Sequence, residues 1–350
     1  MKIKSNKVFT ILFLQLLFFQ SLLLLIFIIK RINIKLAFDK EFLIQYKKYN
    51  LIKNFLNNSG SFQNYNYNFA IITRNFNCSN GLFGYYVAYI SCLHKYLNNG
   101  FIPILDLSLF PNIFNQFKNK SLENNDNPWE LFFNQPFDYK LKYVKKYAKK
   151  IKYVNCNPKN RPDTNIYKNN LLLGFWHNVA IKYIPIKKEI IDESVNYRKR
   201  LFNNSNNVLG VLIRGTDYIS MRPKGHPIQP DPKTVIKDIK EMDKSNKYDY
   251  IFLATEDNLI KKKFISSIGK KLKYIKSNEN LKYNYTKKDY LAFNNDVKGN
   301  INYIKIYLIN IIILSKCLDI ICSRTAGSVG AFIFTNGFRN IKVYFLGRYK

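Results

Sequence analysis

The sequence predicts an α/β protein with parallel sheets, because short β-prone runs alternate along the chain with segments of helical periodicity. Of the 350 residues, 47% are hydrophobic and 16% aromatic, which is enough apolar material for one large core or two. The 14 glycines and 11 prolines are too few for a collagen-like or Pro/Gly-rich disordered chain. A long uncharged run near the N-terminus predicts a membrane segment before this folded body.

Residues 8–29 form an apolar run without a charged side chain. At ~1.5 Å per helical residue, the run is long enough to cross the ~30 Å hydrocarbon layer of a bilayer. A cleaved signal peptide would have a shorter apolar region followed by small residues, whereas the basic segment 30–35 follows here. We therefore expect residues 1–30 to be a short tail and an uncleaved transmembrane helix that anchors the chain in a lipid bilayer.

Lysine and arginine flank the apolar run on both sides, so the charge balance does not orient it. A short N-terminal tail with a long C-terminal body is typical of a single-pass type II membrane protein. The body is therefore expected to face the lumen of the Golgi or ER in a eukaryote, and otherwise to lie at the inner membrane.

The elements of the N-terminal half follow in order. Residues 31–66 are polar, rich in Asn and Lys, and are expected to be a stem. A β-prone run at 68–73, a turn at 77–84, a helix at 85–97 and a second strand at 101–107 then predict a β-loop-α-β unit.

A second α/β unit is expected after the polar segment 190–205, which we take as the boundary between an N-terminal domain (67–200) and a C-terminal domain (201–350). The expected strands are 208–213, 250–254 and 318–322, and the expected helices are 231–242, 258–268 and 302–314. Two loops, 214–217 and 323–328, are expected directly after strands, and the second leads into the apolar run 329–335.

Basic and cysteine residues exclude some classes of function. Lysine and arginine number 56 against 23 acidic residues, a net charge of +33 that is spread evenly, which favours a solvated basic surface. No zinc-finger, RNP-like or basic-helix signature accompanies the charge, so no nucleic-acid partner is expected. The five cysteines form no C-x-x-C pair and no short Cys/His spacing, so no metal site is expected.

Two glycines follow the first predicted strand. Gly81 and Gly84 precede a helix, a position where the backbone can approach a phosphate and the first N–H groups of the helix can bind it. The spacing is not G-x-G-x-x-G and no Walker lysine follows, so a simple structural turn is the alternative.

The sharpest motif is Gly-Val-Leu-Ile-Arg-Gly-Thr-Asp at 210–217, where a strand enters a turn. In parallel α/β folds, ligands bind at the carboxyl ends of the strands, and the guanidinium of Arg214 there has the geometry to grip a diphosphate. Asp217 could orient Arg214, bind a sugar hydroxyl or act as a base. The alternative is an Arg–Asp pair that braces the turn.

The 210–217 motif resembles the first conserved motif of the α1,2/α1,6/protein-O-fucosyltransferase superfamily, G-V-H-x-R-R-x-D. Further similarities occur in the same order as in that superfamily, most of all in its α1,6 members, which include the rhizobial nodulation fucosyltransferases. They are the Gly-x-[Phe/Leu]-Gly loop at 81–84, a His-Pro at 226–227, the F/Y-L-A-T-D-D motif at 252–257 and the L-S…C-[ST]-x-S segment within 314–325. Together they span about residues 67 to 345.

This resemblance implies a GT-B architecture, in which two Rossmann-like domains face a cleft. It also implies an inverting glycosyltransferase that needs no metal and no cofactor. The enzyme would transfer a sugar, with fucose as the first choice, from a GDP-sugar co-substrate to a glycan or glycoprotein.

The resemblance also assigns roles to residues. Arg214 would bond the β-phosphate as GDP leaves, with Arg214 and Asp217 as the catalytic pair. Carboxylates at Glu256 and Asp257 would hold guanine or ribose, and the two glycines would cradle the pyrophosphate. The implied donor-binding set is Gly81, Gly84, Arg214, Thr216, Asp217, Glu256, Asp257, Ser323, Thr325 and Ser328.

The sequence departs from the superfamily pattern at three positions. Leu212 stands in place of the histidine, Gly215 in place of a second arginine, and Arg222 about where an α1,6 member carries its acceptor-activating glutamate. The first candidate for the base is therefore Asp217, followed by Asp231 and His226. Residues Arg222, His226 and Asn310 are candidate supporting residues.

The departures leave a second interpretation open: a catalytically inactive, membrane-tethered relative that binds a glycan or a nucleotide.

The aromatic and amide cluster around Trp129 could line an acceptor groove, although a tryptophan packed under a loop is favoured. His94 and His177 are isolated from any ligand spacing and are expected to be structural.

Overall fold

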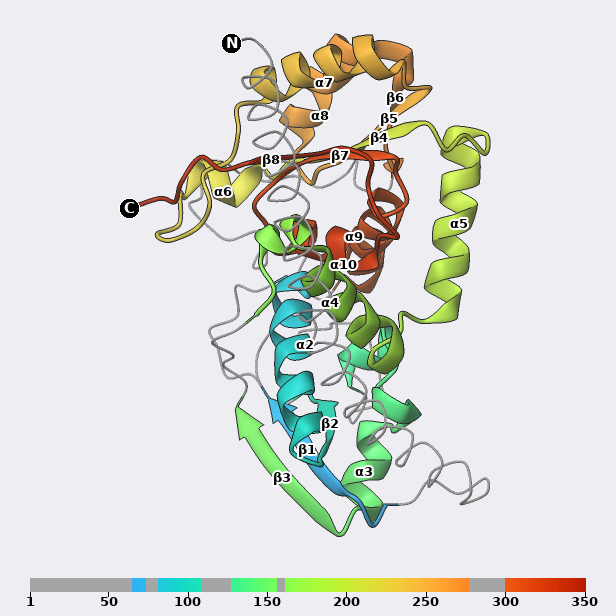
Figure 1. Ribbon diagram of the computed structural model, residues 1–350, viewed down its shortest axis with the longest axis vertical. Helices are drawn as coiled ribbons and strands as arrows, with labels where there is room; N and C mark the ends of the chain where they lie inside the picture. The colour runs from blue at the N-terminus through green and yellow to red at the C-terminus, as the bar shows by residue number, and fades with distance from the viewer. Residues whose placement is uncertain (1–64, 74–80, 109–126, 156–160, 277–299) are drawn as a thin grey trace, which may run out of the picture. The chain divides into compact units, whose positions relative to one another are not determined.

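The computed structural model describes residues 65–73, 81–108, 127–155, 161–276 and 300–350 (Figure 1). The expected anchor at 8–29, nearly all of the expected stem, and the first part of the expected turn at 77–84 lie outside the described residues. Within the described ranges, no helix is both long and apolar enough to span a bilayer. Residues 65–350 form one compact unit.

The N-terminal half is built on a parallel sheet of three strands in the order β2-β1-β3. Its strands are β1 (Asn68–Thr73), β2 (Ile102–Leu105) and β3 (Lys150–Asn155), and its helices are α2 (Leu82–Asn98), α3 (Leu141–Tyr147) and α4 (Asn170–Tyr183), with the 3-10 turns η1 (Pro128–Leu131), η2 (Pro136–Asp138) and η3 (Thr164–Lys168).

The C-terminal half is built on a parallel sheet of five strands in the order β6-β5-β4-β7-β8. Its strands are β4 (Val208–Leu212), β5 (Tyr250–Ala254), β6 (Leu272–Lys273), β7 (Asp319–Ser323) and β8 (Ile341–Tyr344), and the helices of this half are α5 (Lys188–Phe202), α6 (Thr216–Ser220), α7 (Pro232–Asn246), α8 (Asn258–Ile268), α9 (Ile301–Leu314) and α10 (Ala326–Phe334), with the 3-10 turn η4 (Gly269–Lys271).

The strand order of the five-stranded sheet reverses beside β4. The chain runs from β4 outward through β5 to β6, returns by α9, and continues through β7 to β8 on the other side. Such a reversal is the topological switch point at which doubly wound sheets bind their ligands, outside the carboxyl ends of the strands. The crevice expected from topology therefore lies where β4 and β7 end.

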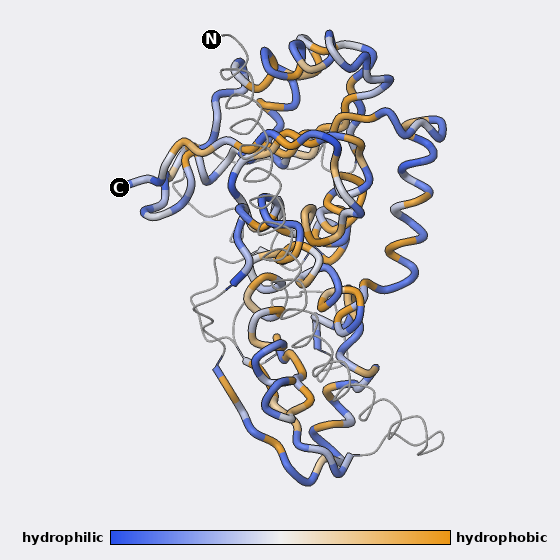
Figure 2. The backbone as a smooth tube through the Cα atoms, in the orientation of Figure 1, coloured by the Kyte–Doolittle hydropathy of each residue, from blue (hydrophilic) through white to orange (hydrophobic). Residues whose placement is uncertain are grey.

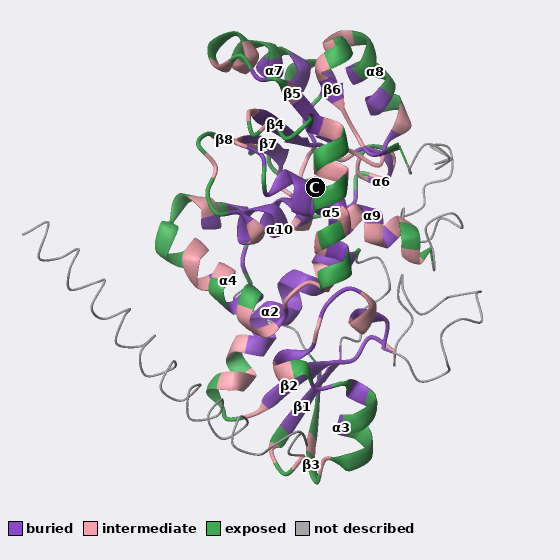
Figure 3. Cartoon of the chain, turned by 90° about the vertical axis from the view of Figure 1, so that its right-hand side faces the viewer, coloured by how far each residue is buried: buried purple, intermediate pink, exposed green. Residues whose placement is uncertain are grey.

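The central strands are buried because helices cover them. Every residue of β4 and β7 is buried, as Figure 3 shows in purple, and Figure 2 shows the same strands as largely hydrophobic. Near-continuous apolar runs such as Val-Leu-Gly-Val-Leu are typical of parallel strands that have no solvent face. The expected α/β class with parallel sheets is confirmed.

Several helices begin earlier than the sequence predicted. Helix α2 begins at Leu82 and not at residue 85, so Gly84 lies in its first turn, where its N–H donates to the Gly81 carbonyl. Leu82 and Phe83 are buried, and this packing outweighs the low helix propensity of glycine. Likewise, α6 occupies part of the turn predicted at 214–217, and α10 begins inside the loop predicted at 323–328.

Strand β3 and helix α5 were not predicted. Strand β3 has the sequence Lys-Ile-Lys-Tyr-Val-Asn and only Val154 is buried, so its apolar signal is weak. The polar segment 190–205, where the domain boundary is expected, lies mostly within α5. The domain limits themselves stay a prediction.

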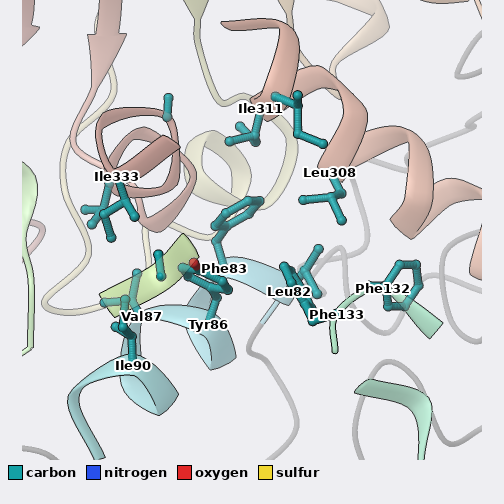
Figure 4. Close-up of a cluster of buried hydrophobic side chains, with 14 of the residues drawn as sticks. Leu82, Phe83, Tyr86, Val87, Ile90, Phe132, Phe133, Leu308, Ile311 and Ile333 are labelled. Atoms are coloured by element: carbon teal, nitrogen blue, oxygen red, sulfur yellow. The ribbon is translucent and has the colours of Figure 1, made fainter. Parts of the chain in front are cut away.

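Aromatic side chains join α2 to the helices of the C-terminal half. The ring of Phe83 contacts the rings of Tyr307 in α9 and Phe334 in α10, at centroid distances of 5.6 and 5.9 Å. Figure 4 shows Phe83 and Tyr86 between side chains of α9 and α10, including Leu308. One hydrophobic cluster therefore contains residues from both sheets.

Residues singled out as structural occupy the core or its edge. Trp129 is fully buried and stacks on Phe133 at 4.2 Å, so it lines no acceptor groove in this structure. The His177 Nδ1 lies 2.7 Å from the Ile333 carbonyl, and the His94 ring contacts Phe175.

The cysteines in the described ranges are of two kinds, free and disulfide-bonded. Cys317 and Cys322 are free and buried, and burial raises the pKa of each thiol to about 12, so neither is a reactive thiolate at neutral pH. Cys92 is disulfide-bonded. Disulfides persist mainly in oxidising compartments.

Asp319 at the start of β7 should contribute to stability in a pH-dependent way. Burial raises the pKa of this carboxyl, but hydrogen bonds from Arg339, Tyr248 and Asn340 outweigh burial and bring the pKa below 3.8. A lowered folded-state pKa adds stability above the unfolded value, and this stability is lost as the pH falls through the folded value. We expect the Asp319→Asn variant to be less stable than the wild type near neutral pH and to lose less stability than the wild type below about pH 3.8. The free energy of unfolding in urea, measured as a function of pH, tests this.

Asp192→Asn is the matched control, because the carboxylate of Asp192 is exposed and pairs with Lys188 at the surface. Such pairs contribute little to stability. An Asp319→Asn profile parallel to that of the wild type would contradict the prediction.

Candidate active site

Arg214 follows β4 and lies between two carboxylates. Its Nη2 is 3.1 Å from Asp217 Oδ1, and its Nε is 3.0 Å from Glu256 Oε1 at the end of β5. The Arg214 side chain is 19% exposed, and the two carboxylates are 9% exposed. Burial alone would lower the pKa of Arg214, but Glu256 and Asp217 raise it well above its ordinary value, so the guanidinium stays charged.

The Arg–Asp pair that the sequence analysis left as an alternative is present. It coexists with a ligand-binding role, because a guanidinium has five N–H donors in a planar fork, more than these two ion pairs use. The carboxylates hold the plane of the guanidinium at the switch-point edge of the sheet. The arrangement can therefore present an oriented, permanently charged donor to an anion.

The two acidic residues after β5 also hold the backbone that follows Arg214. Glu256 Oε1 accepts the Gly215 N–H at 2.9 Å, and Asp257 Oδ2 accepts the Thr216 N–H at 2.9 Å. Asp257 Oδ1 caps α8 by accepting the N–H groups of Leu259 and Ile260. Burial raises the pKa of Glu256, although Arg214 and the Gly215 N–H oppose that increase.

Thr216 is held in a strained backbone conformation. Its φ is +42°, in the left-handed region that β-branched residues rarely adopt. The side chain is fully buried, and its hydroxyl donates to Asp217 at 3.1 Å and to Glu256 at 3.0 Å. These bonds maintain the strained turn that links Arg214 to Asp217.

Gly215 stands where the resembling superfamily has a second arginine, and the structure gives the steric reason. A Cβ at this position would lie 2.0 Å from Asp257 Oδ2 and 2.6 Å from Asp257 Cβ. No side chain fits here while Asp257 keeps its place. The departure from the superfamily pattern is therefore built into this site.

Three tyrosines that the sequence analysis did not select surround Arg214. The guanidinium lies over the ring of Tyr218, with its Cζ 5.0 Å from the ring centroid, and Tyr307 of α9 interacts electrostatically with Arg214. Burial raises the pKa of Tyr307 to about 12, although Arg214 lowers it, and burial and Glu256 raise the pKa of Tyr303. Tyr303 and Tyr307 are one turn apart in a helix otherwise rich in Ile and Leu, which is a spacing that could have marked them.

The hydroxyl residues after β7 support the site from inside. Ser323 and Ser328 are fully buried, and Thr325 is 9% exposed. Thr325 caps α10 by accepting the Ser328 N–H, and the Ser328 hydroxyl donates to the Ser323 carbonyl. In this structure the three residues shape the loop between β7 and α10.

The candidate bases are not all brought together. His226 lies beside Tyr218, with ring centroids 5.4 Å apart, and interacts electrostatically with Arg214 and Asp217. Burial lowers the pKa of His226 and Asp217 raises it, with a net decrease, so the ring is neutral near pH 7. Asp231 instead caps α7 by accepting the Lys233 N–H.

The remaining candidates are placed differently. Arg222 is exposed and has φ +48°. Asn310 is buried in α9, three residues after Tyr307, and its Oδ1 has no hydrogen-bond partner among the described residues. Gly81 is the N-cap of α2, with open space where a Cβ would lie.

No known family model matches the chain, and no curated protein matches it. Solved structures with a similar fold include the NodZ α-1,6-fucosyltransferase soaked with GDP-fucose, at 12% identity over 77% of this chain and 93% of that chain, with a TM-score of 0.41. The fucosyltransferase NodZ from Bradyrhizobium matches at 12% identity over 81% of this chain and 97% of that chain, with a TM-score of 0.45. POFUT1 in complex with GDP matches at 9% identity over 80% of this chain and 99% of that chain, with a TM-score of 0.41.

Proposed function

We propose that the chain is an inverting glycosyltransferase of GT-B type that transfers a sugar, with fucose as the first choice, from a GDP-sugar to a glycan or glycoprotein. The observation that carries the proposal is Arg214 at the switch point of a doubly wound sheet. Along the chain it is followed by the two acidic residues after β5, Glu256 and Asp257, in the motif order of the superfamily that the sequence resembles. Helices α2 and α10 come next along the chain after β1 and β7, so each begins on the carboxyl side of a parallel strand.

The proposed reaction is a single displacement. An acceptor hydroxyl attacks the anomeric carbon, the bond from that carbon to the β-phosphate oxygen breaks, and GDP leaves with the negative charge. Arg214 stabilises that negative charge, a role that a metal ion has in other transferases. The acceptor proton goes to Asp217 or His226, the two candidate bases that lie beside Arg214.

Membrane attachment belongs to the proposal as well. Residues 8–29 would anchor the chain in the bilayer as a type II protein, with the described body facing the Golgi or ER lumen in a eukaryote and otherwise lying at the inner membrane. The disulfide at Cys92 supports an oxidising surrounding.

Nucleotide binding to the purified full chain tests the proposal. We expect GDP and GDP-fucose to bind, UDP to bind at least tenfold more weakly, and excess EDTA to change none of these affinities, in isothermal titration calorimetry. GDP binding that disappears with EDTA would contradict the metal-free mechanism. No binding of any of the three nucleotides would contradict the donor site.

A second candidate function is the catalytically inactive relative that binds a nucleotide or glycan. The pairing of Arg214 with two carboxylates favours it, because both ion pairs reduce the positive potential offered to a phosphate. Release of GDP from GDP-fucose in the presence of a glycan mixture separates the two. Turnover supports the enzyme, and GDP affinity without turnover supports the binding protein.

A further inference from the structure

A short segment after β8, residues 347–349, pairs with the loop after α6 that carries His226 (Figure 1). The Tyr349 N–H donates to the His226 carbonyl at 2.9 Å, and the Gly225 N–H donates to the Tyr349 carbonyl at 2.8 Å. The guanidinium of Arg348 also donates to the Gly225 carbonyl. The main chain is therefore held on both sides of His226 by residues that lie more than a hundred positions away in the sequence.

The His226 ring lies next to the candidate active site. Its centroid is 5.4 Å from that of the Tyr218 ring, and the guanidinium of Arg214 lies over the same Tyr218 ring. The Nδ1 atom of His226 is buried and has no hydrogen-bond partner among the described residues. Many catalytic histidines are oriented by a hydrogen bond at this nitrogen, and His226 is not. Its position therefore depends on its main chain and on the contact with Tyr218.

The two candidate bases beside Arg214 differ in their contacts. Three donors bind Oδ1 of Asp217, each at 3.1 Å: the guanidinium of Arg214, the hydroxyl of Thr216 and the N–H of Tyr218. These contacts use Asp217 to hold the turn and the guanidinium. His226 is neutral near pH 7, because burial lowers its pKa, and a neutral imidazole has one nitrogen that can accept a proton. The arrangement favours His226 as the proton acceptor.

We propose that residues 347–349 are a positioning segment that holds His226 beside Arg214, where His226 receives the proton of the acceptor hydroxyl. The inference rests on the proposed function, which is the sugar transfer itself. In that step the acceptor oxygen bonds to the anomeric carbon, its proton goes to a ring nitrogen of His226, and the bonding electrons of the broken bond leave with GDP. The imidazolium then releases the proton to water. The residues of the segment act through His226 and need not touch a substrate.

Two substitutions of Tyr349 test the main-chain contact in the purified full chain. Tyr349→Pro removes the N–H that bonds the His226 carbonyl, whereas Tyr349→Ala keeps it. The readout is GDP release from GDP-fucose in the presence of a glycan mixture. We expect Tyr349→Pro to lower kcat by about tenfold to a hundredfold, because a displaced base accepts the proton poorly, and to leave the KM for GDP-fucose unchanged. Tyr349→Ala should lose less. An unchanged kcat in Tyr349→Pro, or equal losses in both variants, would overturn the proposal.

Lys187→Pro is the matched control. A second isolated antiparallel bridge joins Phe133 and Ile186, and beside it the Lys187 N–H donates to the Phe132 carbonyl at 3.0 Å. Lys187 has φ −53°, which proline can adopt, so this substitution removes a contact of the same kind far from His226 along the chain. We expect its kcat to stay at the wild-type value. A loss equal to that of Tyr349→Pro would show that breaking any such bridge has the effect, and would overturn the positioning role.

The pKa of His226 reports the position of the ring without any turnover. Burial lowers this pKa below 6.5, Asp217 raises it, and Arg214 and Arg348 lower it further. A ring released from this place should therefore return toward its ordinary pKa of about 6.5. NMR titration of the full chain can follow it, because the chain has only three histidines and the His226 signal is the one that is absent from His226→Gln.

This titration separates failure of the inference from failure of the proposed function. We expect Tyr349→Pro to raise the pKa of His226 toward 6.5 and to leave the pKa of His94 and His177 as in the wild type. An unchanged pKa of His226 would overturn the positioning role, whether or not the wild type transfers a sugar. A raised pKa in a chain whose wild type releases no GDP would support the positioning, and would overturn the role as proton acceptor together with the proposed function.

Discussion

Arg214→Ala should weaken GDP binding by ~2 kcal/mol or more, which is roughly thirtyfold, and lower any turnover by roughly 10²- to 10³-fold. The binding loss follows from removal of a charge-assisted contact to the diphosphate, and the larger rate loss from the charge that develops on the leaving group. Calorimetry and a GDP-release assay measure the two effects. Arg214→Lys keeps the charge without the planar fork and should recover only part of the affinity.

The same substitution should also destabilise the protein, because Asp217 and Glu256 would remain buried without their cation. A matched control is therefore needed. Arg339→Ala removes a guanidinium that holds the buried Asp319 through two contacts at the start of β7. We expect both variants to melt at lower temperature and only Arg214→Ala to lose GDP affinity. If both lose affinity equally, the loss is a consequence of stability and the donor role of Arg214 is wrong.

Gly215→Ala should have the second large effect, this time on the fold of the site. The new Cβ would overlap Asp257, whose carboxylate caps α8 and holds the Thr216 N–H. Overpacking of this kind typically costs about 1–3 kcal/mol, and loss of a helix cap adds about 1 kcal/mol. We expect a clearly lower melting temperature together with loss of nucleotide binding.

Gly174→Ala provides the control for Gly215→Ala. Gly174 lies within α4, and an added Cβ would meet no atom within 4 Å. Alanine in a helix interior is favoured over glycine by about 0.5–1 kcal/mol, so this variant should melt at the same or a higher temperature. A Gly215→Ala variant as stable as Gly174→Ala would show that Asp257 can move, and that the glycine is not sterically required.

The sequence predicted the framework of the C-terminal half well because its strands are apolar and regular. The strand at 250–254 and the helix at 258–268 are confirmed at both ends, since an apolar Tyr-Ile-Phe-Leu-Ala run and an Asp before the helix are strong local signals. Strand β3 could not be found in this way, because an edge strand with one buried residue carries little apolar pattern.

The site was predicted in part, for a similar reason. Arg214, Asp217 and Glu256 were selected from local motifs, and the structure brings them together. Tyr307 was not selected, because its electrostatic interaction with Arg214 depends on the packing of α9 against the sheet and leaves no local signal in the sequence. Strain at Thr216 has no local signal either, since it results from the hydrogen bonds that surround it.

The aromatic contacts between α2 and the helices α9 and α10 bear on how the body unfolds. Trp129 stacks on Phe133, which contacts Tyr86, and Tyr86 contacts both Phe83 and Phe334. Neither half of the body can lose its packing without exposing aromatic rings of the other half. The two halves should consequently denature together in one cooperative transition. The fluorescence of the two buried tryptophans, Trp129 and Trp176, would then report the loss of structure around Arg214, although both tryptophans belong to the other half of the chain.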